Sequence, residues 1–336
     1  AIPMSALMIC YFLVGNMLNA RRFRALGWAS GLWMSVLILS LMWSITHHVS
    51  ELGLSWLGYT MPPFLGPAGL VLAAFLMIVG TRKALEAPHL VEIDIQLKEL
   101  PKELNGLRIV QLSDIHIGPT LGRAFMESIV ARTNALEADL IVITGDLVDG
   151  STMHLASEVE AVFRLKAPLG VFFITGNHEF ISGVDSWVTH LREGGIEVLE
   201  NATIPIEHQG ESFNLVGIED WDSARFHRTR RPNLPKALKG VDTSLPTILL
   251  AHQPKAILEA SELGIDLQLS GHTHGGQFAP FNWLIFLDQP YRNGLYQRGD
   301  TQLYINEGTG YWGPPLRIGT RSEITHITLL SEQARG

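Results

Sequence analysis

The sequence predicts an α/β domain that follows a set of N-terminal transmembrane helices. Three observations lead to this fold class. Almost all charged residues lie beyond position 80, long apolar runs without charge precede it, and short strand-like runs alternate with helical patterns after position 91. We therefore divide the 336 residues into a membrane domain, residues 1–86, and a globular domain, residues 87–336.

Three apolar runs in the first part are candidates for membrane spans, because about 20 helical residues cross a bilayer. They cover residues 4–20, 28–46 and 61–80, and none contains a charged residue. A cleaved signal peptide is an alternative for the first run, but it does not explain the other two. We predict about three transmembrane helices.

The distribution of Lys and Arg predicts the orientation of these spans. Three arginines within residues 21–24 mark the first loop as cytoplasmic, and residues 47–60 contain no Lys or Arg. Arg82 and Lys83 then place the globular domain inside. We expect a multi-pass protein of the cell inner membrane with a cytoplasmic catalytic domain.

The globular part contains seven apolar runs typical of strands and four helical patterns between them. The strands are expected at residues 91–97, 107–112, 140–144, 171–175, 213–218, 247–251 and 267–270, and the helices at 121–136, 154–165, 185–193 and 255–263. Residues 290–329 resemble hairpins and edge strands, and we expect them to form a second sheet.

Charge and cysteine content exclude several classes of function. Beyond position 80 there are 22 basic and 32 acidic residues, so binding to nucleic acid through phosphate attraction is disfavoured. Cys10 is the single cysteine, which excludes disulfides within the chain and metal sites built from cysteines. Nothing in the sequence indicates an obligate protein partner.

Polar residues able to bind metals follow five of the predicted strands directly. Open α/β sheets bind ligands at the carboxyl ends of their strands, so these residues can converge on one site. Residues two apart on an extended segment point the same way, which predicts ligand pairs within the first and last groups. The groups are Asp114 with His116, Asp146 with Asp149, Asn177 with His178 and Glu179, His252, and His272 with His274.

These side chains supply carboxylate, amide and imidazole donors. This set suits manganese, iron or zinc better than calcium or a single magnesium ion. There are more donors than one ion uses, so we predict two divalent ions, a pair that can clamp a phosphoryl group during displacement. Asp149 is expected to support the site from outside the ligand set.

The ordered series resembles the calcineurin-like metallophosphoesterase superfamily over residues 105–330. Its double-glycine Gly-His-Thr-His-Gly-Gly-Gln segment and residues 310–319, Gly-Tyr-Trp-Gly-Pro-Pro-Leu-Arg-Ile-Gly, look like those of the membrane-anchored or exported bacterial branch. The resemblance implies a four-layer α/β/β/α domain with two metal ions, manganese being favoured.

The resemblance also implies a role for each residue of the series. His178 would stabilise the phosphoryl charge or protonate the leaving oxygen, and Glu179 would orient its ring, with a surface partner as the alternative for Glu179. One metal would be held by Asp114, His116, Asp146 and His274, and the other by Asp146, Asn177, His252 and His272.

Two further stretches bear on the substrate. Residues 225–231 form a basic cluster that could meet anionic headgroups, or simply a solvated loop. Residues 278–287 are strongly apolar and could form core, line an acyl groove or touch the bilayer. With the membrane spans, they favour membrane lipids as partners.

We therefore expect a phosphoesterase acting on a phosphoester or pyrophosphate bond of a lipid-linked or nucleotide-type substrate. Relatives of this architecture suggest UDP-2,3-diacylglucosamine as one specific possibility. The alternatives are a general or cyclic-nucleotide phosphodiesterase, and a non-catalytic membrane scaffold that retains a metal site.

Overall fold

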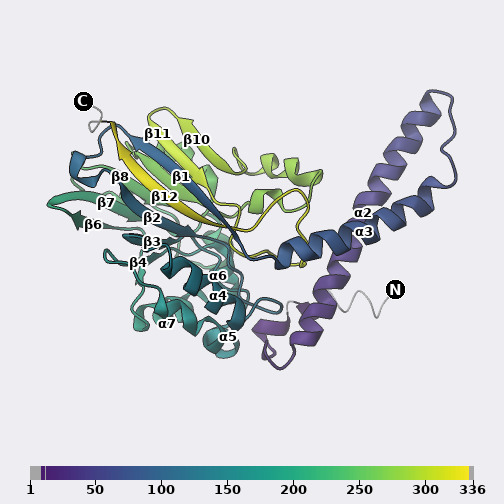
Figure 1. The fold of residues 1–336 in the computed structure, drawn as a ribbon, viewed down its shortest axis with the longest axis horizontal. Coiled ribbons are helices and arrows are strands. Elements are labelled where there is room, and N and C mark those ends of the chain that lie inside the picture. Colours follow the sequence, from purple (N-terminus) through teal and green to yellow (C-terminus); the bar gives the residue numbers. More distant parts are fainter. Residues whose placement is uncertain (1–8, 12, 333–336) are drawn as a thin grey trace.

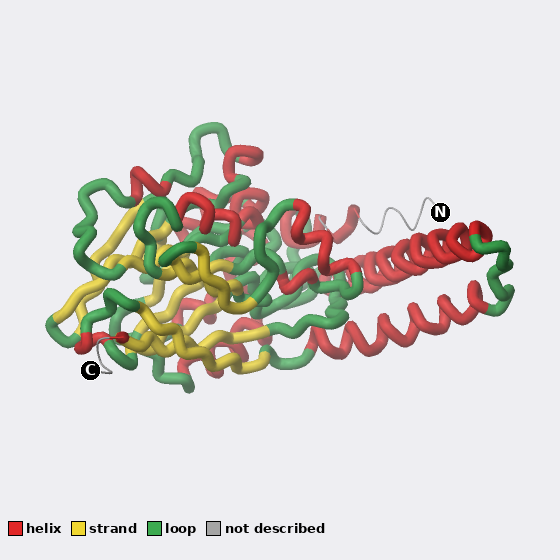
Figure 2. Tube along the Cα trace, turned by 90° about the horizontal axis from the view of Figure 1, so that it is seen from above, coloured by secondary structure: helices red, strands yellow, loops and turns green. Residues whose placement is uncertain are grey.

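The computed structural model describes residues 9–11 and 13–332. A body of mixed helices and strands carries a projecting pair of long helices, α2 (Arg24–Trp56) and α3 (Leu65–Leu85) (Figure 1). The end of β12 (Glu323–Ser331) lies on the side of the body opposite this hairpin (Figure 2). The α/β fold class predicted from the sequence is confirmed.

The remaining elements of the body alternate in the order expected for layered α/β domains. The other strands are β1 (His89–Leu97), β2 (Leu107–Leu112), β3 (Leu140–Ile143), β4 (Val171–Phe173), β5 (Glu197–Val198), β6 (Ala202–His208), β7 (Glu211–Gly217), β8 (Thr247–Leu250), β9 (Leu267–Ser270), β10 (Gly294–Arg298) and β11 (Thr301–Ile305). The α-helices are α4 (Arg123–Asn134), α5 (Thr152–Val159), α6 (Asn177–Ser182), α7 (Val184–Glu193), α8 (Ser223–Phe226), α9 (Leu234–Ala237) and α10 (Ile257–Ala260). The 3₁₀ turns are η1 (Lys102–Leu104), η2 (Glu160–Arg164), η3 (Pro254–Ala256), η4 (His274–Gly276) and η5 (Phe281–Leu287).

The strands form two six-stranded sheets. The first has the order β1-β12-β2-β3-β4-β5, and the second has the order β10-β11-β9-β8-β7-β6. Strands β2 to β5 run parallel to one another, and so do β7, β8, β9 and β11. The carboxyl ends of each parallel group therefore lie at one edge of its sheet.

The two sheets pack face to face and helices cover their outer faces. Strand β3 shows the principle, since Leu140 and Val142 enter the core between the sheets while Ile141 and Ile143 face the helices. The outer core of the first sheet includes α4, α5 and α7, and that of the second includes α9 and α10. This arrangement is the expected α/β/β/α order of layers.

Residues 290–329 differ from the expectation in one respect. Strands β10 and β11 form a hairpin at the edge of the second sheet, as predicted. Strand β12 instead lies inside the first sheet, where it pairs parallel with β1 and antiparallel with β2. Most of its residues are buried, which accounts for a central position. Strands β5 and β6 also lack a counterpart in the prediction.

The hairpin contains two helices that are long and apolar enough to cross a membrane, by length and composition. The first part of α2 is seated on the body through Gly27, Gly31 and Met34, and its buried residues end at Leu39. Beyond that point large apolar side chains are exposed on both helices, including Leu41, Ile45, Val49, Leu52, Trp56, Leu70, Val71, Phe75 and Ile78.

Two expectations about the first 86 residues need correction. The predicted external loop at 47–60 is shorter, because α2 continues through Gly53 to Trp56. The first predicted span falls partly outside the described residues, which exclude 1–8 and 12. Its described end packs on the body instead: Val14 is buried there, and Ser151 N donates to Gly15 O at 3.0 Å.

Candidate metal centre

The predicted ligands come from both sheets and meet at their shared edge. Asp114 and His116 follow β2, Asp146 follows β3, and Asn177 opens α6 after β4. From the second sheet, His252 follows β8, and His272 and His274 follow β9. The structure thus brings all seven predicted ligands to one region, at the carboxyl ends of parallel strands.

Five of these residues adopt a left-handed backbone conformation, with φ between 50° and 70°: Asp114, His116, Asp146, His272 and His274. The loops therefore turn sharply at each ligand, and the extended geometry expected for the two pairs is wrong. Asp and His tolerate this region better than most residues, and strain of this kind gathers at functional sites. The sharp turns explain why His272 and His274 face different groups of side chains.

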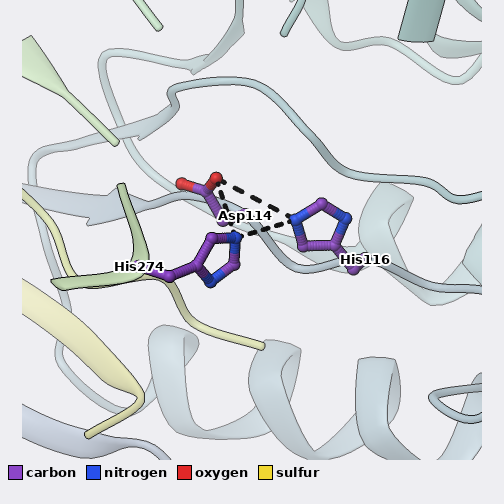
Figure 3. A group of neighbouring side chains, drawn as sticks. All are labelled: Asp114, His116 and His274. Atoms are coloured by element: carbon purple, nitrogen blue, oxygen red, sulfur yellow. Dashed lines mark hydrogen bonds and ion pairs between the residues drawn. The ribbon is translucent and has the colours of Figure 1, made fainter. Parts of the chain in front are cut away.

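The first group consists of Asp114, His116 and His274, all buried (Figure 3). The Nε2 atoms of the two imidazoles lie 3.0 Å apart, and His274 Nε2 lies 3.3 Å from Asp114 Oδ1. His116 Nε2 is 3.9 Å from the same oxygen. A divalent cation fits this convergence of donor atoms, because it can accept all three lone pairs together.

The second group consists of Asp146, His252 and His272. His252 Nε2 lies 3.2 Å from Asp146 Oδ2 and 3.2 Å from His272 Nδ1. The other ring nitrogen of His252 donates to the carbonyl oxygen of Thr144 at 2.7 Å. This bond leaves Nε2 unprotonated in a neutral ring, the arrangement usual for histidines that bind metals.

Asp146 and Asn177 connect the two groups. Asp146 Oδ2 faces His252 from one side and lies 3.9 Å from His116 Nε2 on the other, so it is placed to bridge two ions. Asn177 Oδ1 is buried and accepts no hydrogen bond within the described structure. An orphaned buried oxygen beside these donors fits a role as metal ligand.

Electrostatics suit the imidazoles for metal binding. Burial, followed by the neighbouring His252, lowers the pKa of His272 to about 4. Burial likewise lowers the pKa of His274 to about 4, despite the opposing effect of Asp114. Both rings are therefore neutral at pH 7 and keep a free lone pair.

The two acids keep their charge in the same environment. Burial raises the pKa of Asp146, but His252 and His178 outweigh it and hold the pKa well below its usual range. The pKa of Asp114 is likewise lowered, since His274 and His252 outweigh burial. Although burial lowers the pKa of the neighbouring His252, Asp146 raises it well above its usual value. The buried negative charge of the two carboxylates thus attracts cations, which favours divalent metal ions.

His178 is held by Asp149 rather than by Glu179. Asp149 Oδ1 lies 2.7 Å from His178 Nδ1 and 2.8 Å from His116 Nδ1, so one carboxylate orients both rings. Although burial lowers the pKa of His178, Asp146 and Asp149 raise it to about 10. The ring therefore carries a proton at neutral pH.

Glu179 has a different role from the one expected. Its side chain is fully buried, which rules out a surface partner. The carboxylate accepts backbone N–H bonds from Gly176 at 2.7 Å, Asp146 at 2.9 Å and Leu147 at 2.8 Å. Glu179 therefore fixes the loop that presents Asp146 and does not orient His178.

A cavity of about 360 Å³ opens beside the metal ligands. One wall carries His116, Asp146, Asn177, His178, His272 and His274. The lining also includes the apolar side chains Phe278, Leu284, Ile285 and Trp312, called here the apolar wall, and the polar residues Thr273, Gln277, Asp288 and Gln289. Trp283, Phe286 and Leu287 of the same η5 segment are exposed, so residues 283–287 are not ordinary core.

The basic cluster at 225–231 is not a free cationic patch. Arg230 forms ion pairs with Asp185, Glu200 and Glu219. Arg231 donates to the backbone oxygens of residues 227, 228 and 230. Two of the four arginines in the cluster, Arg230 and Arg231, are therefore occupied by contacts within the domain.

Comparison with known proteins agrees with this site. A family model described as calcineurin-like phosphoesterase matches residues 107–276. The chain is 32% identical over 256 residues to the uncharacterized metallophosphoesterase YkuE of Bacillus subtilis, covering 73% of this chain and 87% of that protein. The chain belongs to the calcineurin-like phosphoesterase family.

Relatives with higher sequence identity than this one have longer chains, so this chain spans a smaller part of them. The chain is 41% identical over 268 residues to a Danio rerio protein named transmembrane protein with metallophosphoesterase domain, covering 77% of this chain and 61% of that one. The resemblance is thus not confined to bacteria. A solved 5′-nucleotidase precursor from Thermus thermophilus superposes with a TM-score of 0.42 at 15% identity, covering 66% of this chain and 54% of that one.

Proposed function

We propose that the protein is a membrane-anchored phosphoesterase that uses two divalent ions to cleave a phosphoester or pyrophosphate bond in a lipid-linked substrate. The observation that carries the proposal is the cavity, whose lining combines the predicted metal ligands with the apolar wall. A substrate that joins a phosphate to an acyl chain matches both parts of this lining. UDP-2,3-diacylglucosamine is one candidate with this chemistry.

Each ion would have its own set of ligands, with one residue shared between them. Asp114, His116 and His274 would hold one ion, His252, His272 and Asn177 the other, and Asp146 both. The ions supply a water molecule whose pKa is lowered toward neutrality and neutralise phosphoryl charge, with manganese, iron or zinc suited to these donors.

His178 supplies the proton that the leaving group needs. Its ring borders the cavity and is protonated at pH 7. It can donate this proton to the leaving oxygen as the phosphorus–oxygen bond breaks, while Asp149 holds the ring in place. Glu179 keeps Asp146 in position throughout.

The apolar wall supports a lipid-linked substrate. Leu284 and Ile285 line the cavity, and the exposed Trp283, Phe286 and Leu287 extend the apolar surface away from it. The η5 segment, green in Figure 1, lies on the side of the body from which the hairpin projects. An acyl chain that leaves the bilayer there can reach the ligands while contacting apolar side chains.

Activity of the purified full chain loaded with manganese tests the reaction class. Bis(p-nitrophenyl) phosphate and UDP-2,3-diacylglucosamine in mixed micelles serve as substrates. Asp146→Asn is expected to abolish turnover of both, because a bridging ligand is lost. Hydrolysis of the small diester but not of the lipid-linked substrate would indicate a general or cyclic-nucleotide phosphodiesterase. No hydrolysis of either substrate would indicate a scaffold.

The double variant Leu284→Ser, Ile285→Ser tests the acyl groove. Each buried methylene contributes about 0.8 kcal/mol, so the KM for acylated substrate is expected to rise at least about tenfold, with the small diester unaffected. Leu263→Ser is the control, since Leu263 is also exposed but precedes β9 at the edge opposite His272. Equal effects on both substrates would contradict acyl binding at this wall.

A further inference from the structure

A buried arginine supports the first group of ligands from behind. Arg317 is fully buried in the segment 310–319 and is absent from the predicted ligand set. Its Nη1 donates to the carbonyl oxygen of His274 at 3.3 Å, and its Nη2 lies 3.3 Å from the ring of that histidine. Nη2 also donates to Glu307 O at 2.8 Å and Gly310 O at 2.6 Å. The guanidinium therefore ties the loop of His274 to the segment that precedes β12.

The last turns of α3 hold Arg317 in place. Arg317 N donates to the carbonyl oxygen of Gly80 at 3.0 Å. A Cβ atom at position 80 would lie 2.6 Å from Leu316 Cδ1, 3.1 Å from Arg317 O and 3.2 Å from Ile318 Cγ1. A side chain at this position would require Leu316 to shift and would crowd the backbone of Arg317, so glycine favours the close approach of the helix.

Helix α2 contacts the same segment from its other end. A Cβ atom at Gly31 would lie 2.9 Å from Pro315 Cδ. One at Gly27 would lie 2.6 Å from the carbonyl oxygen of Pro119, three residues after the ligand His116. The ion pair between Arg24 and Glu158, 2.5 Å long and half-buried, fastens this end of α2 to the body. Both hairpin helices thus rest on loops that carry the metal centre.

We propose that the hairpin is a positioning element of the metal centre. The close contact at Gly80 of α3 fixes the position of Arg317, and Arg317 fixes the position of His274 for metal binding. The inference rests on the metal centre of the proposed function. It assigns Arg317 and Gly80 as positioning residues, because neither touches the cavity. The membrane helices then determine the geometry of the site as well as its location.

Gly80→Val in the full-length chain tests this connection. Valine does not lower helix propensity relative to glycine, so α3 is expected to form. Its close contact with residues 316–318 is expected to be lost. Mn²⁺ binding, measured by metal analysis and electron paramagnetic resonance, is expected to weaken at least tenfold at the Asp114–His116–His274 group only. The spectrum should change from that of a coupled ion pair to that of a single ion, and kcat should fall with KM little changed.

Gly66→Val is the matched control on the same helix, because a Cβ atom there would meet nothing within 4 Å. Arg317→Lys is the second variant: it keeps the positive charge but loses the fork that reaches several carbonyls, and it should weaken the same ion. Normal occupancy in both Gly80→Val and Arg317→Lys would overturn the proposal. So would equal weakening of both ions, which indicates general destabilisation. Metal binding is measured without hydrolysis, so an inactive protein still tests the inference.

Discussion

Asp149 shows how one side chain can set the state of two others. Its Oδ1 lies within 2.8 Å of the Nδ1 atoms of both His116 and His178. The bond to His116 leaves Nε2 of that ring facing the first group of ligands. The bond to His178 holds a proton on a ring that borders the cavity. A metal ligand and a candidate acid are therefore oriented by one carboxylate.

His178→Ala is expected to separate catalysis from metal binding. His178 is not in the two groups of predicted ligands, although it forms a third cluster with His116 and Asp149. Because we assign it as the acid and not as a ligand, the variant should retain two ions while kcat falls by about 10²–10⁴, the usual range for the loss of a general acid. Metal analysis and kinetics with the small diester measure the two effects. Asp149→Asn is the companion variant and should lower kcat as well as the affinity of the ion at His116. An empty site in His178→Ala would mean that this ring is a ligand.

That the candidate ligands meet at one edge of the sheets could be predicted, because residue type and position after a strand are visible in the sequence. Asp114, His116 and Asp146 each follow an apolar run, and only a few side chains bind metals. The partners of Glu179 could not be predicted, because backbone N–H groups leave no trace in the sequence. Arg317 was missed for a similar reason, since five of its partners are carbonyl oxygens.

At the scale of elements, β12 joins the end of the chain to the first sheet. It follows the segment that contains Arg317 and pairs with β1 and β2. The sequence predicted strands in residues 290–329, but a strand pattern alone does not specify which sheet receives each strand. Its first residue, Glu323, is buried, and its Oε1 accepts hydrogen bonds from Tyr304 and Thr325 at 3.0 Å.

The stability contributed by the buried contacts of Glu323 at the start of β12 should depend on pH. Burial, followed by the nearby Glu307, raises the pKa of Glu323 to about 7, from 4.5. The folded state therefore holds the proton of Glu323 more tightly than the unfolded state does. The resulting contribution to the free energy of unfolding is fully present below pH 4.5 and is lost as pH rises through about 7. The loss is up to about 3 kcal/mol at pH 8. Unfolding temperatures in detergent between pH 5 and 8 should vary less in Glu323→Gln than in the original chain.

Glu92→Gln provides the comparison for this measurement. Glu92 lies on the neighbouring β1, and its side chain is 74% exposed. The pH profile of this variant should follow that of the original chain. If Glu323→Gln does so too, the carboxyl group of Glu323 is not the source of the pH dependence.

At the scale of the whole molecule, the hairpin combines a docked base with an exposed apolar end. Residues 40–56 of α2 and 65–79 of α3 project roughly 25 Å and 22 Å from the body at 1.5 Å per residue. These lengths approach the roughly 30 Å of bilayer hydrocarbon. The apolar helices could be predicted because their composition can be read from the sequence. Their packing against the body could not be predicted, because it depends on close contacts at Gly27, Gly31 and Gly80.

The docked base places both ends of the hairpin against the body. Gly15 lies before α2 and its carbonyl oxygen accepts from Ser151 of the body, while Gly80 contacts residues 316–318. The arginines near position 22 and Arg82 with Lys83 therefore lie at the same end of the hairpin, and the positive-inside rule predicts that this end is cytoplasmic. We propose that the helices cross the inner membrane and that residues 57–64 turn on its outer face.

Cysteine labelling in whole cells tests this orientation in a Cys10→Ser background. A cysteine at Thr60, in the turn between the helices, is expected to react with an impermeant maleimide. One at Glu262, an exposed residue of the body, should react only after the membrane is opened. Labelling of Glu262 alone would place the metal centre outside the cytoplasm. Protection of both sites would mean that the hairpin enters the bilayer without reaching its far surface. The projecting helices, at less than 30 Å, would then be too short to cross the hydrocarbon.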